Sequence, residues 1–128
     1  MRFMMLVKAT PEHEAGSPPR PEVIAEVGKL AEEMARAGTL VSSGGLLPSR
    51  EAQRVVMRGG RSTVTDGPFT ETKELIGGFA VVEAGSKSEA LALARRFLEA
   101  HVRAGMLDLD LEIRPMFDGA RCSEMQPA

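Results

Sequence analysis

The residues best able to do chemistry in this chain lie in one short stretch that carries Asp66, Glu71, Lys73 and Glu74. If the stretch is extended, Glu71 and Lys73 share a face, so a carboxylate and an ammonium converge on the same space. A carboxylate held among apolar side chains has a raised pKa and can serve as a general base. We therefore take Asp66 and Glu71 as catalytic candidates, and Lys73 as a candidate for binding a ligand.

The chemistry that such a carboxylate could support is proton abstraction next to a carbonyl, as in a lactone isomerase-like reaction. Simple binding of a small molecule is favoured over it, because no His adjoins these carboxylates in the sequence and no metal-binding motif is present. Arg114 is a second binding candidate for an anionic ligand, although Asp108, Asp110 or solvent are its expected partners. We predict no metal and no cofactor, and whether the protein is an enzyme stays open.

The residues from Asp66 to Phe69 also have a purely structural interpretation. Asp66 can accept a backbone amide two residues on in an Asx-turn, Gly67 can adopt a positive φ, and Pro68 restricts the backbone. Phe69 would then anchor the turn in the core. This interpretation explains these four residues without a ligand, but it does not explain the charged residues that follow them.

Both histidines are given structural roles from the sequence. His13 lies between two glutamates in the Pro-rich segment 9–21, which we interpret as an extended loop in which adjacent side chains point apart. A solvated charge cluster is therefore favoured there over a metal ligand or a proton shuttle. His101 ends the apolar stripe of a helix, where the helix dipole favours an imidazolium, and a structural role is again favoured over a catalytic one.

Composition limits the class of protein. A chain of 128 residues that is 43% hydrophobic supports one domain, which we place at residues 1–117 with a loose tail at 118–128. The formal charge of -2 and the absence of Tyr and Trp argue against direct nucleic-acid binding. The apolar run at residues 3–7 is too short for a signal or a membrane span, so we expect a cytoplasmic protein. Cys122 alone cannot form an internal disulfide.

Periodicity predicts the elements that must hold the charged stretch. One helix is expected from Pro21 to the stop at Gly38, and another from the capping box that starts at Ser86 to the stop at Gly105. Paired glycines between β-rich runs predict a hairpin. The expected strands, including the two hairpin arms, are 3–7, 39–43, 53–58, 61–65, 76–83 and 107–114.

The order of these elements is that of a ferredoxin-like βαββαβ unit with an inserted β-hairpin, in the α+β class. The strands at 3–7 and 76–83 are apolar on both faces and are expected at the centre of the sheet, while 107–114 takes an edge. Two helices cover only one face of such a sheet. A homodimer packed sheet to sheet would cover the other, and the alternative is a monomer in which the hairpin and tail fold back over it.

Five stretches of the chain are similar to those of a known family: Arg2 to Val7, Gly45-Leu46, Val64 to Glu74, Gly77-Gly78-Phe79 and Glu112 to Pro115. Through them the chain resembles the YCII-related family, in particular its DGPF branch. The resemblance implies a dimeric α/β barrel of ferredoxin-like protomers with a cleft between sheet and loops. We expect the small-molecule pocket at the barrel mouth formed by the loop at residues 65–74. It also implies an alternative to small-molecule chemistry, a non-enzymatic regulatory module linked to sigma-factor-dependent transcription. A His-Asp pair has suggested acid/base chemistry in another branch, but neither histidine here falls in a matching motif.

Overall fold

The computed structural model describes residues 1–71 and 74–117, so Lys73, Cys122 and the predicted tail lie outside the described residues. The described part combines antiparallel sheets with three α-helices, as expected for the α+β class. The strands are β1 (Arg2–Lys8), β2 (Leu40–Gly45), β3 (Gln53–Arg58), β4 (Arg61–Asp66), β5 (Ile76–Glu83) and β6 (Leu111–Pro115). The helices are α1 (Pro11–Glu14), α2 (Pro21–Arg36) and α3 (Lys87–Arg103), with a 3₁₀ turn η1 (Ser49–Glu51).

The main sheet has four strands in the order β2-β5-β1-β6, with each neighbouring pair antiparallel. This arrangement is compatible with a ferredoxin-like fold, and it confirms the predicted central and edge strands. β6 is shorter than predicted and begins at Leu111. The reason is its partner: β1 ends at Lys8, whose amide donates to the Asp110 carbonyl at 2.9 Å, so residues 107–109 have no β1 backbone beside them.

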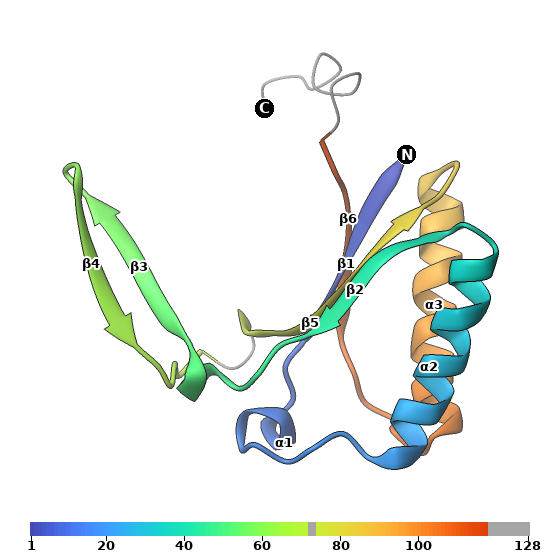
Figure 1. Ribbon diagram of the computed structural model, residues 1–128, viewed down its shortest axis with the longest axis horizontal. Coiled ribbons are helices and arrows are strands. Elements are labelled where there is room, and N and C mark those ends of the chain that lie inside the picture. The colour runs from blue at the N-terminus through green and yellow to red at the C-terminus, as the bar shows by residue number, and fades with distance from the viewer. Residues whose placement is uncertain (72–73, 118–128) are drawn as a thin grey trace.

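Helices α2 and α3 lie together on one face of the sheet (Figure 1). Phe3, Met5 and Val82 point toward them and are almost fully buried. Leu91 lies on the outer side of α3 and is exposed. Three of the buried residues of α3 are alanines. The buried residues that the helices contribute are Leu30, Met34, Ala90, Leu93, Ala94, Ala100 and His101.

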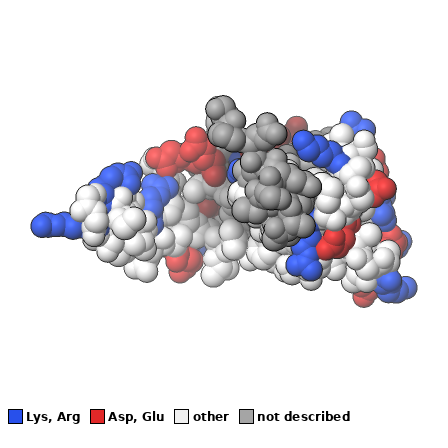
Figure 2. Space-filling model, turned by 90° about the horizontal axis from the view of Figure 1, so that it is seen from above, with Lys and Arg blue, Asp and Glu red and all other residues white. Residues whose placement is uncertain are grey.

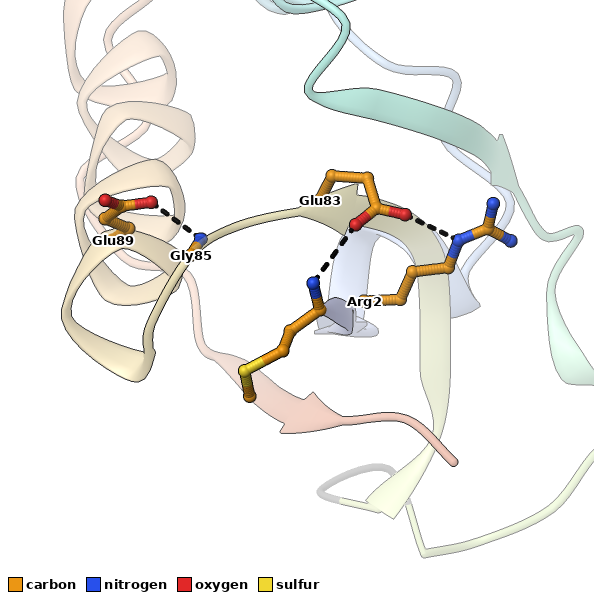
Figure 3. A network of polar contacts seen from close by, with 5 residues as sticks. Arg2, Glu83, Gly85 and Glu89 are labelled. Atoms are coloured by element: carbon orange, nitrogen blue, oxygen red, sulfur yellow. Dashed lines mark hydrogen bonds and ion pairs between the residues drawn. The ribbon is translucent and has the colours of Figure 1, made fainter. Parts of the chain in front are cut away.

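The start of α3 follows the predicted cap with one change. The Ser86 hydroxyl accepts the Glu89 amide at 3.2 Å, as expected for an N-cap. The Glu89 carboxylate accepts the Gly85 amide at 2.7 Å, one residue before the amide that a capping box would use (Figure 3). Nearby, Glu83 accepts from the Met1 amino group at 3.3 Å and from Arg2 Nε at 2.7 Å, and the hydrogen bond from Arg2 is the main cause that lowers the pKa of Glu83.

The second face of the sheet carries apolar side chains that none of the described helices covers. Met4 is paired with Val81, and Leu6 with Phe79, on this open face. Hairpin β3-β4 projects away from the sheet, so it does not cover the face (Figure 1). The monomeric alternative is therefore wrong for the hairpin, and the tail lies outside the described residues.

The hairpin forms as predicted, with Gly59 at φ 58 and Gly60 at φ 77 in its turn. Val55 pairs with Val64, and Met57 lies two residues after Val55 on the same strand. These three exposed apolar side chains therefore lie on one face of the hairpin. Because side chains alternate along each strand, the other face carries three arginines: Arg54, Arg58 and Arg61. Figure 2 shows basic side chains gathered at the outer end of this hairpin.

Candidate functional site

A cavity of about 1030 Å³ lies between the helix pair and the sheet. It is bounded by α1, by the inner side of α2, by the end of α3 and by the sheet edge at which β1 and β2 end and β5 begins. Most of its lining is apolar, which suits an organic ligand. The main apolar residues of the lining are Met5, Val7, Val27, Leu30, Met34 and Phe97.

His13 enters this cavity from α1, a short helix where we had predicted an extended loop. The helix forms because the Thr10 side chain accepts the His13 amide at 3.1 Å, and because Pro11 at the first helical position needs no donor partner. The His13 Nε2 atom is buried and has no hydrogen-bond partner within residues 1–71 and 74–117. Buried polar atoms are normally paired, so His13 Nε2 is an exception among the described residues.

His101 lines the same cavity from the last turn of α3 and is only 7% exposed. Its Nδ1 atom lies 2.9 Å from the carbonyl oxygen of Phe97. A carbonyl oxygen can only accept, so Nδ1 carries a hydrogen and donates it. In the neutral ring, Nε2 is then the nitrogen with a free lone pair. The ring also contacts Phe97, with centroids 4.7 Å apart.

Charged groups stand at the edge of the cavity. Arg20 Nη2 donates to the carbonyl of Ala104 at 3.2 Å and so ties the start of α2 to the end of α3. Lys8, Glu12 and Asp108 also belong to the lining. The cavity therefore combines an apolar interior with two imidazoles and charges of both signs.

A buried serine connects α1 to the turn at residues 66–69. Ser49 is 6% exposed, and its amide donates to Glu14 Oε1 at 2.8 Å while its hydroxyl donates to Glu14 Oε2 at 2.6 Å. The same hydroxyl accepts the Phe69 amide at 3.0 Å. The hydroxyl bond, and after it the amide bond, lower the pKa of the Glu14 carboxyl. Glu14, Ser49 and Phe69 also line a second cavity of about 400 Å³.

The turn itself differs in detail from the predicted one. The Asx-turn is wrong, because the residue two positions on is Pro68, which has no N–H, and Asp66 Oδ1 instead accepts from Gln53 Nε2 at 3.0 Å. Gly67 is not at a positive φ. It is required for space, because a Cβ there would overlap the carbonyl oxygen of Ser49. Phe69 is half-buried and lies under the Arg54 guanidinium, 4.0 Å from the ring centroid, rather than in the main core.

None of the described candidates from the sequence lines the large cavity. Asp66 is exposed at the base of the hairpin, and Glu71 pairs with Arg54 at 3.5 Å. Arg114 lies on the open face of the sheet, where its Nε is 3.7 Å from Glu112 rather than near Asp108 or Asp110. Lys73 lies outside the described residues. The catalytic and binding roles of these residues stay predictions.

From the sequence, both histidines were given structural roles, whereas the fold brings them to one cavity. For His13 a signal was present, since Thr10-Pro11 followed by acidic residues is the start of a helix. For His101 the helical spacing already placed the ring on the inner face of α3. The sequence does not reveal the cavity beside that face, because the cavity depends on how the helices pack.

Two classes of site find no support in the described residues. Within residues 1–71 and 74–117, no group of three or more His, Cys, Asp or Glu side chains is placed to hold a metal ion. In the same part of the chain, no helix is long and apolar enough to cross a membrane.

Comparison with known proteins gives a matching family model and a similar curated protein. The family model of the YCII-related domain matches residues 1–107. An uncharacterized protein of Rhizobium meliloti (strain 1021) is 32% identical over 94 residues, which are 73% of each chain. The matched region contains every described element except β6 and includes both histidines and the turn at residues 66–69. The chain belongs to the YCII-related domain family.

Proposed function

We propose that the protein binds a small organic molecule in the cavity between the helix pair and the sheet. The observation that carries this proposal is the large, mostly apolar cavity whose lining includes both His13 and His101. The apolar lining suits a hydrocarbon or aromatic body. The imidazoles and Arg20 suit a carbonyl, hydroxyl or carboxylate on that body.

The chemistry that this cavity supports is redox-neutral proton transfer, as in an isomerase-like reaction. Imidazole is the side chain that most readily changes charge between pH 5 and 8. One ring could remove the proton next to a carbonyl while the other returns a proton elsewhere on the same molecule. His101 fits the role of base, because Phe97 fixes its tautomer and leaves Nε2 with a lone pair. A regulatory module without turnover would use the same cavity only for binding.

A second part of the proposal concerns the dimer and the DGPF branch. The open face that carries Met4, Leu6, Phe79 and Val81 supports sheet-to-sheet pairing of two copies. Arg114 lies on that face and would then belong to the interface or to the mouth of the resulting barrel. The catalytic roles of Asp66 and Glu71 and the binding role of Lys73 also belong to this proposal. They would require a site that is completed by the second copy.

The test of ligand binding uses 1-anilinonaphthalene-8-sulfonate, an aromatic anion, followed by its fluorescence. Ala31→Phe places a ring in the cavity from α2, whereas Ala25→Phe adds the same ring at an exposed position of that helix which is not part of the lining. We expect Ala31→Phe to weaken binding by about tenfold or more and Ala25→Phe to leave it unchanged. Equal affinities in two folded variants would place the probe elsewhere and contradict the proposal.

Turnover distinguishes the enzymatic and regulatory forms of the proposal. Small lactones and enolisable ketones are incubated in deuterated water, and deuterium uptake at the carbon next to the carbonyl is followed by NMR. Catalysed uptake that is lost in His101→Gln supports proton transfer. Binding of the fluorescent anion without any catalysed uptake supports a binding module.

A further inference from the structure

The turn at residues 66–69 lies outside the large cavity, yet it is connected to α1, which carries His13. We infer that Ser49 and Glu14 are positioning residues for His13, and that the turn acts on the cavity through them. This inference rests on the proposed function, because it concerns the same cavity. It gives the Asp-Gly-Pro-Phe sequence a role that needs no ligand at the turn itself.

The first step of the argument is that α1 cannot hold its own position. It has four residues, none of which is buried, and helices of this length are not stable alone. Its N-terminus is held by the Thr10 cap. Its C-terminal residue, Glu14, is held by Ser49, so the direction of the intervening His13 depends on both attachments.

The second step is the strength of the attachment between Glu14 and Ser49. Both carboxylate oxygens accept hydrogen bonds from the same residue, at 2.8 Å from the amide and 2.6 Å from the hydroxyl. Hydrogen bonds to an ionised carboxylate are roughly twice as strong as neutral ones. Because Ser49 is buried, water competes little for its donors. The pair therefore fixes the orientation of α1 better than a surface ion pair would.

The third step is that the turn fixes Ser49. The Phe69 amide donates to the Ser49 hydroxyl at 3.0 Å, which leaves that hydroxyl's hydrogen directed to Glu14. Gly67 lies against the Ser49 carbonyl too closely for any side chain, and its amide donates to the carbonyl of Ala52 at 2.9 Å. The 3₁₀ turn η1 is thus held between the 66–69 turn and α1.

The connection from Phe69 through Ser49 and Glu14 to His13 is called the relay below. His101 supplies an internal reference for testing it. It lines the same cavity but is held by α3 through Phe97, and none of the relay residues contacts it in any described hydrogen bond or ring contact. Loss of the Ser49 hydroxyl should therefore change the environment of the His13 ring and leave that of His101 unchanged. A general loss of structure would change both rings.

The experiment records ring ¹H–¹⁵N NMR spectra of the full chain labelled at histidine, together with the affinity for the fluorescent anion. Ser49→Ala should shift or broaden the His13 ring signals alone and weaken probe binding by a factor between about 2 and about 10. Ser49→Thr keeps a hydroxyl and should restore both readouts. Ser62→Ala, an exposed serine of the hairpin, is the matched control and should change neither.

The outcomes separate this inference from the proposed function. Unchanged His13 signals in folded Ser49→Ala overturn the inference, even if the probe binds in the cavity. Failure of the wild-type chain to bind the probe contradicts the proposed function, while the ring signals still test the relay. If Ser49→Ala does not fold, Glu14→Gln is measured in its place, since it removes the charge at nearly constant size. Unchanged His13 signals there overturn the inference in the same way.

Discussion

At the scale of single residues, the contact between Glu14 and Ser49 makes a prediction about acid. The pKa of Glu14 is lowered mainly by the hydrogen bond from the Ser49 hydroxyl. Ser49→Ala should raise that pKa toward the ordinary glutamate range, since the largest cause is removed. Carboxyl ¹³C NMR titration of both proteins measures the shift. An identical Glu14 titration in the two proteins would contradict the assigned cause.

The same contact fixes the sign of a pH effect on stability. A carboxyl whose pKa is lowered by folding contributes stability above its unfolded pKa, and this contribution is lost as the pH falls through the lowered folded value. The stability difference between wild type and Ser49→Ala should therefore be largest near neutral pH and shrink in acid. Urea unfolding at neutral pH and at the acid end of the carboxyl range compares the two. If the stability difference between the two proteins grew as the pH fell, the result would contradict the assigned effect.

Gly67 provides a second prediction at this scale. A Cβ at this position would overlap the Ser49 carbonyl, so Gly67→Ala should lower the free energy of unfolding by more than about 1 kcal/mol. Gly45→Ala is the matched control, because a Cβ there meets no atom within 4 Å. Thermal and urea unfolding of both variants measure the difference. Equal small effects would show that the turn can move away from Ser49.

The sequence was sufficient to locate this turn and insufficient to predict its bonds. Gly, Pro and Asp mark a turn through local backbone preferences, which act within a few residues. The Ser49 contact joins segments about twenty residues apart and leaves no local pattern. The Asx-turn was wrong for a local reason that could have been recognised, since Pro68 has no N–H. The position of His13 in the cavity lining could not be predicted, because the cavity exists only after α2 has packed on the sheet.

At the scale of elements, the cap of α3 is the clearest test. The Ser86 hydroxyl accepts the Glu89 amide, so Ser86→Ala should destabilise the protein by about 1 kcal/mol. Ser88→Ala, two residues further into the same helix, removes an exposed hydroxyl that caps no helix end and should have a much smaller effect. Urea unfolding of the two variants compares them. Equal destabilisation would indicate that the cap bond contributes little.

The elements that could be predicted are those in which an apolar repeat continues over many residues or in which turn-forming residues mark the ends. Helix α2 combined an apolar stripe with Pro21 and Gly38, and the hairpin combined β-rich arms with two glycines. Helix α1 was missed because four residues are too few to show a period. β6 was predicted too long, because alternation continues along the sequence where the neighbouring strand has ended. Pairing across the sheet, rather than local pattern, sets that boundary.

At the scale of the whole molecule, two apolar surfaces are covered by none of the described helices. One is the open face of the sheet, and the other is the hairpin face formed by Val55, Met57 and Val64. The hairpin projects away from the sheet, so these two surfaces do not cover one another within a single copy (Figure 1). An isolated two-stranded hairpin is only marginally stable. Association of two copies is the simplest arrangement that would bury the sheet face, and it would bring new neighbours near the hairpin.

The dimer is tested by placing a charge at the centre of the open face. Leu6 is paired with Phe79 on one side and Glu112 on the other, so Leu6→Glu sets a new carboxylate among apolar side chains and beside an existing one. We expect a dimer for the wild-type chain and a monomer for this variant in sedimentation velocity at micromolar concentration. Leu91→Glu adds the same charge on the exposed side of α3 and should remain dimeric. A wild-type monomer, or a Leu6→Glu dimer as tight as the wild type, would contradict sheet-to-sheet pairing, because an unpaired carboxylate cannot be buried in an apolar interface without a large cost.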